Sequence, residues 1–346
     1  MNFLSDNTAP VAPEILQALE SVNEGFAAAY GADVESLRLD AVFSRYFATP
    51  VRAFAVATGT AANALALATV TPPYGAVYCH REAHIVRDEC NAVEAATGGA
   101  RLVLLDGDGA MLTPEALQAA VAAHPANVHT PQPAAVSISQ ATERGRCYRP
   151  AALAALCRAA HDLGLRVHMD GARFANAVAF LGCEPADLTV RAGVDVLSFG
   201  ATKNGALAAE AVVFFDPALV RDFELRRKRA AHLLSKMRYF AAQLTSYIES
   251  DVWLRNARRA NAFAARLAAS AGARLAEPVE ANELFLRLDA GEAAALRAAG
   301  FRFHDWGAQG SGEYRFVVSW NQSEGDVEAL GAALRRLGAE SANVRR

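Results

Sequence analysis

Between about residues 53 and 216 the chain alternates short apolar runs with longer amphipathic segments rich in alanine. Short runs of Val, Leu and Phe are typical of buried strands, and the longer segments have helical periodicity. Strands are expected at Phe54–Ala57, Ala76–Cys79, Leu102–Leu105, Ala135–Ser139, Leu165–Met169, Val194–Phe199 and Ala211–Phe215. Helices are expected at Ala61–Val70, Pro114–Ala123 and Arg149–Leu163, the last ended by Gly164. This alternation predicts parallel strands joined by crossover helices, with ligands bound at the carboxyl ends of the strands.

The pattern changes after Asp216. A basic, alanine-rich tract from Pro217 to Ala271 predicts a long helical region. Strands are then expected at Leu284–Leu288, Phe301–Phe303 and Tyr314–Trp320, followed by a helix over Ser323–Leu337 with Ser323 as its N-cap. The sequence thus predicts a large domain over residues 12–245, a smaller C-terminal α/β domain over 246–346, and an N-terminal segment over 1–11.

Composition narrows the class of protein. The 346 residues are 53% hydrophobic and 21% charged, which is enough apolar surface for a folded core and excludes an intrinsically disordered chain. The net charge of −3 disfavours a nucleic-acid partner and leaves a small molecule as the expected one. The apolar stretch Ala53–Val70 is interrupted by polar residues, so no membrane span is expected. No secretory signal opens the chain and the five cysteines form no paired motif, which predicts a cytoplasmic protein with reduced thiols.

Lysine is rare in this chain and occurs only at Lys203, Lys228 and Lys236, so that 31 of the 34 basic residues are arginine. Arginine cannot replace lysine where a reaction needs a primary amine that can lose its proton. Lys203 directly follows a predicted strand, at the edge of the sheet where ligands bind, although a surface loop lysine is the alternative. Lys228 lies in a basic run that fits either a solvated helix face or a phosphate across an interface.

Three further features follow predicted strands. Asp170 ends a buried strand, where a carboxylate either caps a helix or pairs with a buried cation such as a heterocycle nitrogen. The turn Thr58–Asn63 opens a helix whose amino terminus can bind an anion, and it lacks the fingerprint of dinucleotide sites. His84 is either structural or placed to stack on a planar cofactor or move a proton. His80 precedes it by four residues, but no third ligand is evident and no metal is expected. A lysine and an aspartate at neighbouring strand ends are the pair that proteins use with pyridoxal phosphate.

A series of motifs in matching order resembles the threonine aldolases, which are fold-type-I pyridoxal-phosphate enzymes. The motifs are Ser5-Asp-Asn-Thr8, Tyr30-Gly31, Thr58-Gly-Thr60 with Ala62-Asn63, Ala83-His84, His168-Met-Asp-Gly-Ala-Arg173 and Thr202-Lys203. The resemblance covers nearly the whole chain. It implies a mostly parallel seven-stranded sheet with helices on both faces and a smaller C-terminal α/β lobe, with segment 1–11 reaching the active site.

The resemblance also implies roles for single residues. Lys203 would form the Schiff base with pyridoxal 5′-phosphate, Asp170 would pair with the ring nitrogen, and His84 would stack on the ring. The remaining cofactor contacts would come from Thr58, Gly59, Thr60, Arg173, Thr202 and, from a neighbouring subunit, Arg238. The substrate would be bound by Ser5, Tyr30, Arg173 and Arg315. Many members have a second histidine after the central strand, and Glu143 stands at that place here. The proton of the β-hydroxyl would then pass to His84 or to Glu143.

The expected reaction is retro-aldol cleavage of L-threonine, L-allo-threonine and related β-hydroxy-α-amino acids to glycine and an aldehyde. The expected assembly is a homo-oligomer, a tetramer built as a dimer of dimers, with active sites shared between subunits. Three alternatives are compatible with the sequence. The chain could be a β-eliminating lyase or an aminotransferase of the same fold type, or a non-catalytic α/β protein that binds a phosphate ligand.

Overall fold

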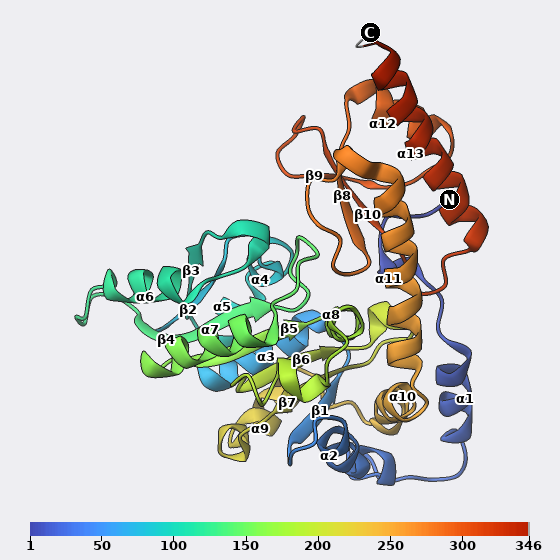
Figure 1. The fold of residues 1–346 in the computed structure, drawn as a ribbon. Helices are drawn as coiled ribbons and strands as arrows, with labels where there is room; N and C mark the ends of the chain where they lie inside the picture. Colours follow the sequence, from blue (N-terminus) through green and yellow to red (C-terminus); the bar gives the residue numbers. More distant parts are fainter. Residues whose placement is uncertain (345–346) are drawn as a thin grey trace.

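A seven-stranded sheet forms the centre of the larger part of the molecule in the computed structural model, which describes residues 1–344 (Figure 1). Its strands lie in the order β1-β7-β6-β5-β4-β2-β3. Their bounds are β1 Arg52–Val56, β2 Gly75–His80, β3 Arg101–Leu105, β4 Gln132–Ser139, β5 Arg166–Gly171, β6 Val196–Gly200 and β7 Glu210–Phe214. Each of the seven strands expected between residues 53 and 216 is confirmed within a few residues, and the mostly parallel seven-stranded sheet is confirmed.

One strand runs against the expected direction. β7 pairs antiparallel with both of its neighbours, β1 and β6, whereas all the other pairings in the sheet are parallel. The parallel arrangement that the alternation predicts therefore does not extend to the run Ala211–Phe215, and the sheet is mostly parallel, as the resemblance implies. The physical reason is the short connection from Gly200 to Glu210, because a parallel crossover needs about a dozen residues or more.

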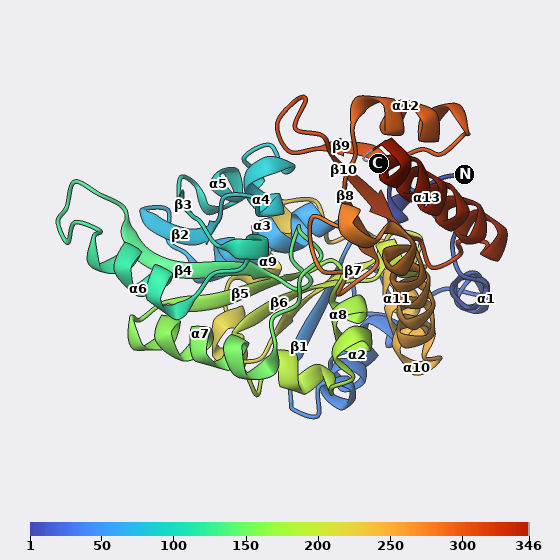
Figure 2. The ribbon, with the colours of Figure 1, turned by 45° about the horizontal axis from the view of Figure 1, so that its top comes forward.

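Helices cover both faces of this sheet, as expected (Figure 2). Alternate residues of β1 are buried on opposite faces of the sheet. Phe54 and Val56 pack with α3 and α9, whereas Ala53 and Ala55 belong to the core on the other face. The helices of the larger part are α1 Pro13–Ser21, α2 Val34–Tyr46, α3 Gly59–Val70, α4 His84–Arg87, α5 Ala92–Thr97, α6 Pro114–Ala122, α7 Pro150–Asp162, α8 Phe174–Leu181, α9 Phe223–Arg229 and α10 Arg238–Glu249. Gly164 has φ +74° just past α7, which confirms it as the residue that ends this helix.

A second, three-stranded antiparallel sheet lies in the C-terminal part. Its strands β8 Glu283–Arg287, β9 His304–Trp306 and β10 Glu313–Val317 lie in the order β8-β10-β9. The helices α11 Val252–Ala271, α12 Ala290–Ala298 and α13 Glu324–Val344 accompany it. Phe3 is buried in its core, and the Phe3 amide donates to the Arg302 carbonyl at 2.9 Å. The start of the chain is thereby attached to the far end of the sequence.

One expectation for the C-terminal half needs correction. The strand expected at Phe301–Phe303 begins only at His304, because the two phenylalanine rings fill the core and the intervening Arg302 bridges to Asn2. The helical tract expected over Pro217–Ala271 is present as α9, α10 and α11; an irregular stretch separates α9 from α10, and α11 starts after Asp251 at φ +56°. The N-cap of α13 is confirmed, since the Asp326 amide donates to the Ser323 hydroxyl at 3.0 Å. Among residues 1–344, no helix combines the length and the apolar character that crossing a membrane requires.

Candidate active site

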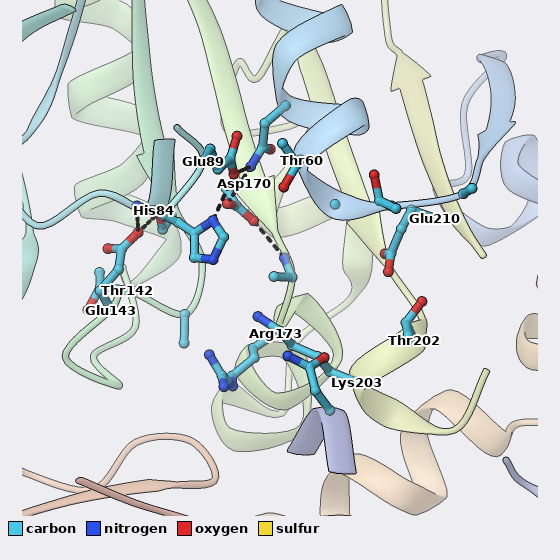
Figure 3. A pocket seen from close by; sticks show the side chains of 18 of the residues that line it. Thr60, His84, Glu89, Thr142, Glu143, Asp170, Arg173, Thr202, Lys203 and Glu210 are labelled. Atoms are coloured by element: carbon cyan, nitrogen blue, oxygen red, sulfur yellow. Dashed lines mark hydrogen bonds and ion pairs between the residues drawn. The ribbon is translucent and has the colours of Figure 1, made fainter. Parts of the chain in front are cut away.

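A cavity of about 400 Å³ opens where the carboxyl ends of the parallel strands meet (Figure 3). The loops that follow five strands of the large sheet, β1, β2, β4, β5 and β6, all contribute to its wall. The residues expected at the site that line it are Thr58, Gly59, Thr60, His84, Glu143, Asp170, Arg173, Thr202 and Lys203. The expected residues that meet here lie up to 145 positions apart in the sequence, from Thr58 to Lys203, as strand-end binding in open α/β sheets requires.

Lys203 reaches the cavity from a 3-10 turn, Thr202–Asn204, that directly follows β6. The loops after β5 and β6 come close together only because position 200 is glycine: a Cβ there would lie 2.7 Å from the Cα of Ala172. The turn is anchored by Asn204, whose side-chain amide donates to the Tyr247 hydroxyl at 2.6 Å and to the Trp253 carbonyl at 2.8 Å. These contacts hold the lysine in a defined position.

Asp170 is a buried anion beside the lysine, with 7% of its surface exposed. Burial opposes its ionisation, but the positive charges of His84 and Lys203 hold its pKa below the ordinary value. Its two oxygens accept hydrogen bonds from the Asn63 amide at 2.8 Å and from the Ala172 backbone at 2.9 Å. A carboxylate that stays ionised in a cavity wall can hold a cationic ring nitrogen.

His84 is joined to Glu89, a residue that the sequence analysis did not single out. The His84 Nδ1 lies 2.7 Å from Glu89 Oε1, and the Asn63 amide that contacts Asp170 also donates to the same Glu89 oxygen at 2.8 Å. The hydrogen bond from the imidazole to Glu89 raises the pKa of His84, and burial raises the pKa of Glu89. Atoms of His84, Glu89 and Asp170 lie within 4.8 Å of one another, a spacing that a cation could also use. Hydrogen bonds link His84 to Glu89 and, through Asn63, to Asp170, and they fix the orientation of the imidazole in the cavity wall.

Glu143 faces His84 from the loop after β4. Its Oε1 accepts from the Ser139 hydroxyl at 2.6 Å and from the His84 backbone amide at 2.9 Å. Burial raises the pKa of Glu143 to about 7. The loop is tied to the C-terminal part, since Arg144 pairs with Glu313 at 2.5 Å. A carboxyl group with a pKa near neutrality is suited to accept and return a proton.

The amino terminus of α3 offers a place for an anion. Thr58 caps the helix by accepting from the Ala61 amide at 3.2 Å, while the amides of Gly59 and Thr60 have no acceptor within the helix. A Cβ at Gly59 would meet nothing within 4 Å, so the space beside it is open. Thr202 and Glu210 line the same region. The sequence analysis did not predict Glu210 as a site residue, although it is the one acidic residue in the apolar run 206–215 and could have been noticed for that reason.

The other residues expected at the site do not line this cavity: Ser5, Tyr30, Arg238 and Arg315. Arg315 lies behind the wall, where its Nη1 is 3.9 Å from the buried Glu283, which also pairs with Arg173 at 3.4 Å. The Ser5 hydroxyl accepts from the amide of Asn7, a cavity residue. Tyr30 is exposed beneath the Lys228 ammonium, 4.3 Å from the ring centre, and Arg238 donates to the Gly25 carbonyl.

Asp6 is a further residue that the sequence analysis did not single out. It is 2% exposed and binds Arg173 through both carboxylate oxygens, at 2.8 and 3.0 Å. The Arg173 charge holds the pKa of Asp6 below its ordinary value against the opposing effect of burial. Its position inside the motif Ser5–Thr8 was the only signal in the sequence. Arg173 is therefore held between the N-terminal segment and Glu283 of β8.

The amine, the buried carboxylate and the helix terminus match the aldehyde, the ring nitrogen and the phosphate of one cofactor, pyridoxal phosphate. Fold and cavity therefore define the class, a fold-type-I pyridoxal-phosphate enzyme. The sequence model of a family described as beta-eliminating lyase matches residues 2–290. The chain belongs to this family and, within it, to the threonine aldolases.

Three relatives show how far the similarity extends. Low specificity L-threonine aldolases of Pseudomonas sp. (strain NCIMB 10558) and Pseudomonas aeruginosa are 43% and 42% identical to this chain, and each alignment covers 96% of both proteins. The structure of the threonine aldolase of Leishmania major has 25% identity and a TM-score of 0.91, and covers 97% of this chain and 99% of that one. The similarity therefore spans nearly the full length of the chain.

Proposed function

We propose that this protein is an aldehyde-lyase that cleaves L-threonine, L-allo-threonine and related β-hydroxy-α-amino acids to glycine and an aldehyde. The observation that carries the proposal is the single cavity that combines Lys203 and Asp170 with a proton acceptor, Glu143, in a member of the threonine aldolases. The reaction breaks the Cα–Cβ bond while the β-hydroxyl loses its proton. It needs an acceptor for the electrons of that bond and another for the proton.

The cofactor is pyridoxal 5′-phosphate, which supplies the electron sink. Lys203 would bind its aldehyde carbon through the amine. Asp170 would keep the ring nitrogen charged, since its own pKa is lowered by His84 and Lys203. His84, held by Glu89, would pack against the ring. The amides at the start of α3, with Thr58 and Thr202, would bind the phosphate.

Arg173 and Arg315 are proposed to bind the substrate carboxylate, because a guanidinium can hold a carboxylate through two parallel hydrogen bonds and so fix its orientation. Asp6 and Glu283 offset the charge of the two arginines and hold them in place. In this proposal the substrate site forms where the domain of residues 12–245 meets the domain of residues 246–346, with Ser5 contributed by the N-terminal segment. The orientation of the carboxylate would in turn fix the direction of the Cα–Cβ bond that is broken.

Glu143 is proposed as the base that takes the proton of the β-hydroxyl. Its raised pKa, near 7, and its position beside His84 support this role. A base titrating near neutral pH both accepts the proton readily and is ionised in a useful fraction of molecules. His84 is the alternative acceptor.

The direct test is product analysis with the purified protein loaded with pyridoxal phosphate. L-Threonine should yield glycine and acetaldehyde in equal amounts, without a keto-acid acceptor. The Lys203→Ala variant, prepared in the same way, is the matched control and should yield neither. Ammonia with 2-oxobutanoate would instead identify a β-eliminating lyase, and an aminated cofactor would identify an aminotransferase. A protein that binds the cofactor and converts no amino acid would contradict the proposal.

We further propose a cytoplasmic homo-oligomer, a tetramer assembled as a dimer of dimers, whose active sites are shared between subunits. Arg238 would then reach the phosphate, and Tyr30 the substrate, in a neighbouring subunit. The exposed apolar side chains Phe26, Val34 and Leu37, near Tyr30 in the sequence, support a contact surface there. Mixed oligomers of Arg238→Ala and Lys203→Ala subunits should regain activity that neither variant has alone. No recovery after confirmed mixing would contradict shared sites.

A further inference from the structure

Glu210 enters the cavity because β7 runs antiparallel to its neighbours. It is the first residue of β7, and it lies opposite Val56 and Gly200, the last residues of β1 and β6. The start of β7 therefore lies at the edge of the sheet where the parallel strands end. Glu210 is 8% exposed, and it lines the cavity together with Thr58 at the start of α3. Figure 3 shows it on the same side of the cavity as Thr60 and Thr202.

The hydrogen-bond partners of Glu210 come from the turn that follows β6. Its Oε2 accepts from the Ala201 amide at 3.0 Å, and the Thr202 hydroxyl also hydrogen-bonds to the carboxylate. The titratable groups that face it are Lys203, from the turn after β6, and the Tyr247 phenol, from α10. The α3 helix carries no charged side chain. Burial raises the pKa of Glu210 to about 7.

This arrangement puts an acidic side chain in the subsite that the helix terminus prepares for a phosphate. A phosphate monoester is close to a dianion at neutral pH, because its second pKa is about 6. An ionised carboxylate beside it would repel it strongly, since charges in a cavity wall are poorly screened. A neutral carboxylic acid in the same place would instead supply a hydrogen-bond donor.

We propose that Glu210 binds the cofactor phosphate as a neutral carboxylic acid, taking up one proton from solvent when the phosphate enters and donating its O–H to a phosphate oxygen. Oε2 accepts the hydrogen bond from the Ala201 amide, so we place the proton on the other oxygen, where it leaves this hydrogen bond intact. This inference rests on the proposed function only in that the cavity takes pyridoxal phosphate. Its consequence is a linkage: affinity for the phosphate group falls as pH rises above the pKa of the free carboxyl.

The experiment compares two ligands that differ only in the phosphate. Dissociation constants of pyridoxal 5′-phosphate and 5′-deoxypyridoxal are measured by absorbance titration between pH 7 and 9. Their ratio cancels the pH dependence that arises at the ring and the aldehyde, from groups such as Asp170, His84 and Glu143, because both ligands share these parts. With a free-enzyme pKa of about 7, the advantage of the phosphate should fall about fiftyfold across this range.

Glu210→Gln keeps a donor and an acceptor but cannot ionise. Its ratio should stay constant across this pH range and should exceed the native ratio at pH 9. The matched control is Glu89→Gln, which changes another buried glutamate of the same cavity at the ring end and should keep the native slope. Circular dichroism confirms that each variant is folded, and the slope of the native protein tests the inference without any variant.

The possible outcomes distinguish a failure of the role of Glu210 from a failure of the proposed cofactor. A constant ratio in the native protein, or an unchanged slope in Glu210→Gln, would overturn the role of Glu210 while leaving the cofactor in place. Failure of both ligands to bind would overturn the proposed cofactor and the role of Glu210 with it.

Discussion

The Ser139 hydroxyl should set the pH at which the enzyme becomes active. It donates to Glu143 Oε1 at 2.6 Å, and a hydrogen bond to a charged group contributes about 1.5–3 kcal/mol. Because about 1.4 kcal/mol corresponds to one pKa unit, losing the hydroxyl should raise the pKa of Glu143 by about one unit. The lower end of the range applies, since water can replace part of the lost hydrogen bond. In Ser139→Ala the pKa should therefore rise from about 7 to about 8.

The assay is kcat/KM for cleavage of L-threonine, measured as acetaldehyde released between about pH 5.5 and 9, because this quantity reports the pKa values of the free enzyme. A base must be ionised to act, so activity rises with pH through its pKa. The rising limb of Ser139→Ala should lie about one pH unit above that of the native enzyme, with the two rates converging at high pH.

Two variants control this measurement. Ser246→Ala removes a hydroxyl that donates to the Glu14 carbonyl away from the cavity, and it should leave the limb in place. Glu143→Gln should abolish the limb and lower kcat/KM by about 10²–10⁴-fold. If Ser139→Ala leaves the limb where it was and Glu143→Gln retains it, Glu143 is not the base and the reasoning is refuted.

Three other variants test the site and the core. Lys203→Ala should lose turnover and should not be linked to the cofactor by borohydride, as judged by the mass of the protein; a linked and active variant would contradict the assignment. Asp170→Asn, loaded with cofactor, should lose at least about a hundredfold in kcat, because a neutral amide cannot hold the ring nitrogen charged; near-native kcat would count against it. His168 hydrogen-bonds to the hydroxyls of Ser137 and Ser198, and burial lowers its pKa from 6.5 to about 4. The unfolded chain then binds a proton that the native chain excludes, so stability should fall by up to about 3 kcal/mol as pH drops from 6.5 to 4. His168→Asn should flatten this dependence in denaturant unfolding, and an unchanged slope would refute the account.

Much of the fold and of the candidate cavity could be predicted from local patterns. A short apolar run is buried whichever neighbours it finds, so all seven strands of the large sheet were expected close to their observed positions. Residues placed just after such runs, such as His84, Asp170 and Lys203, were expected at one edge because parallel strands end together. Gly59 and Thr60 were found by the same reasoning, since a helix that follows a strand turns its free amides toward that edge.

The sequence alone determined which residues follow buried strands, because burial of an apolar run and the start of a helix depend on a few neighbours in the chain. The tertiary structure decided which of these ends meet, and in which direction a strand runs. Glu210 lies at the start of its strand and reaches the cavity only because β7 is antiparallel. Glu89 is placed by its bonds to His84 and Asn63, and Asp6 by its pairing with Arg173, 167 positions away. Buried charges are stable only when they are paired, and their partners can lie anywhere in the sequence. The hydrophobic periodicity of the chain therefore does not reveal which charges pair.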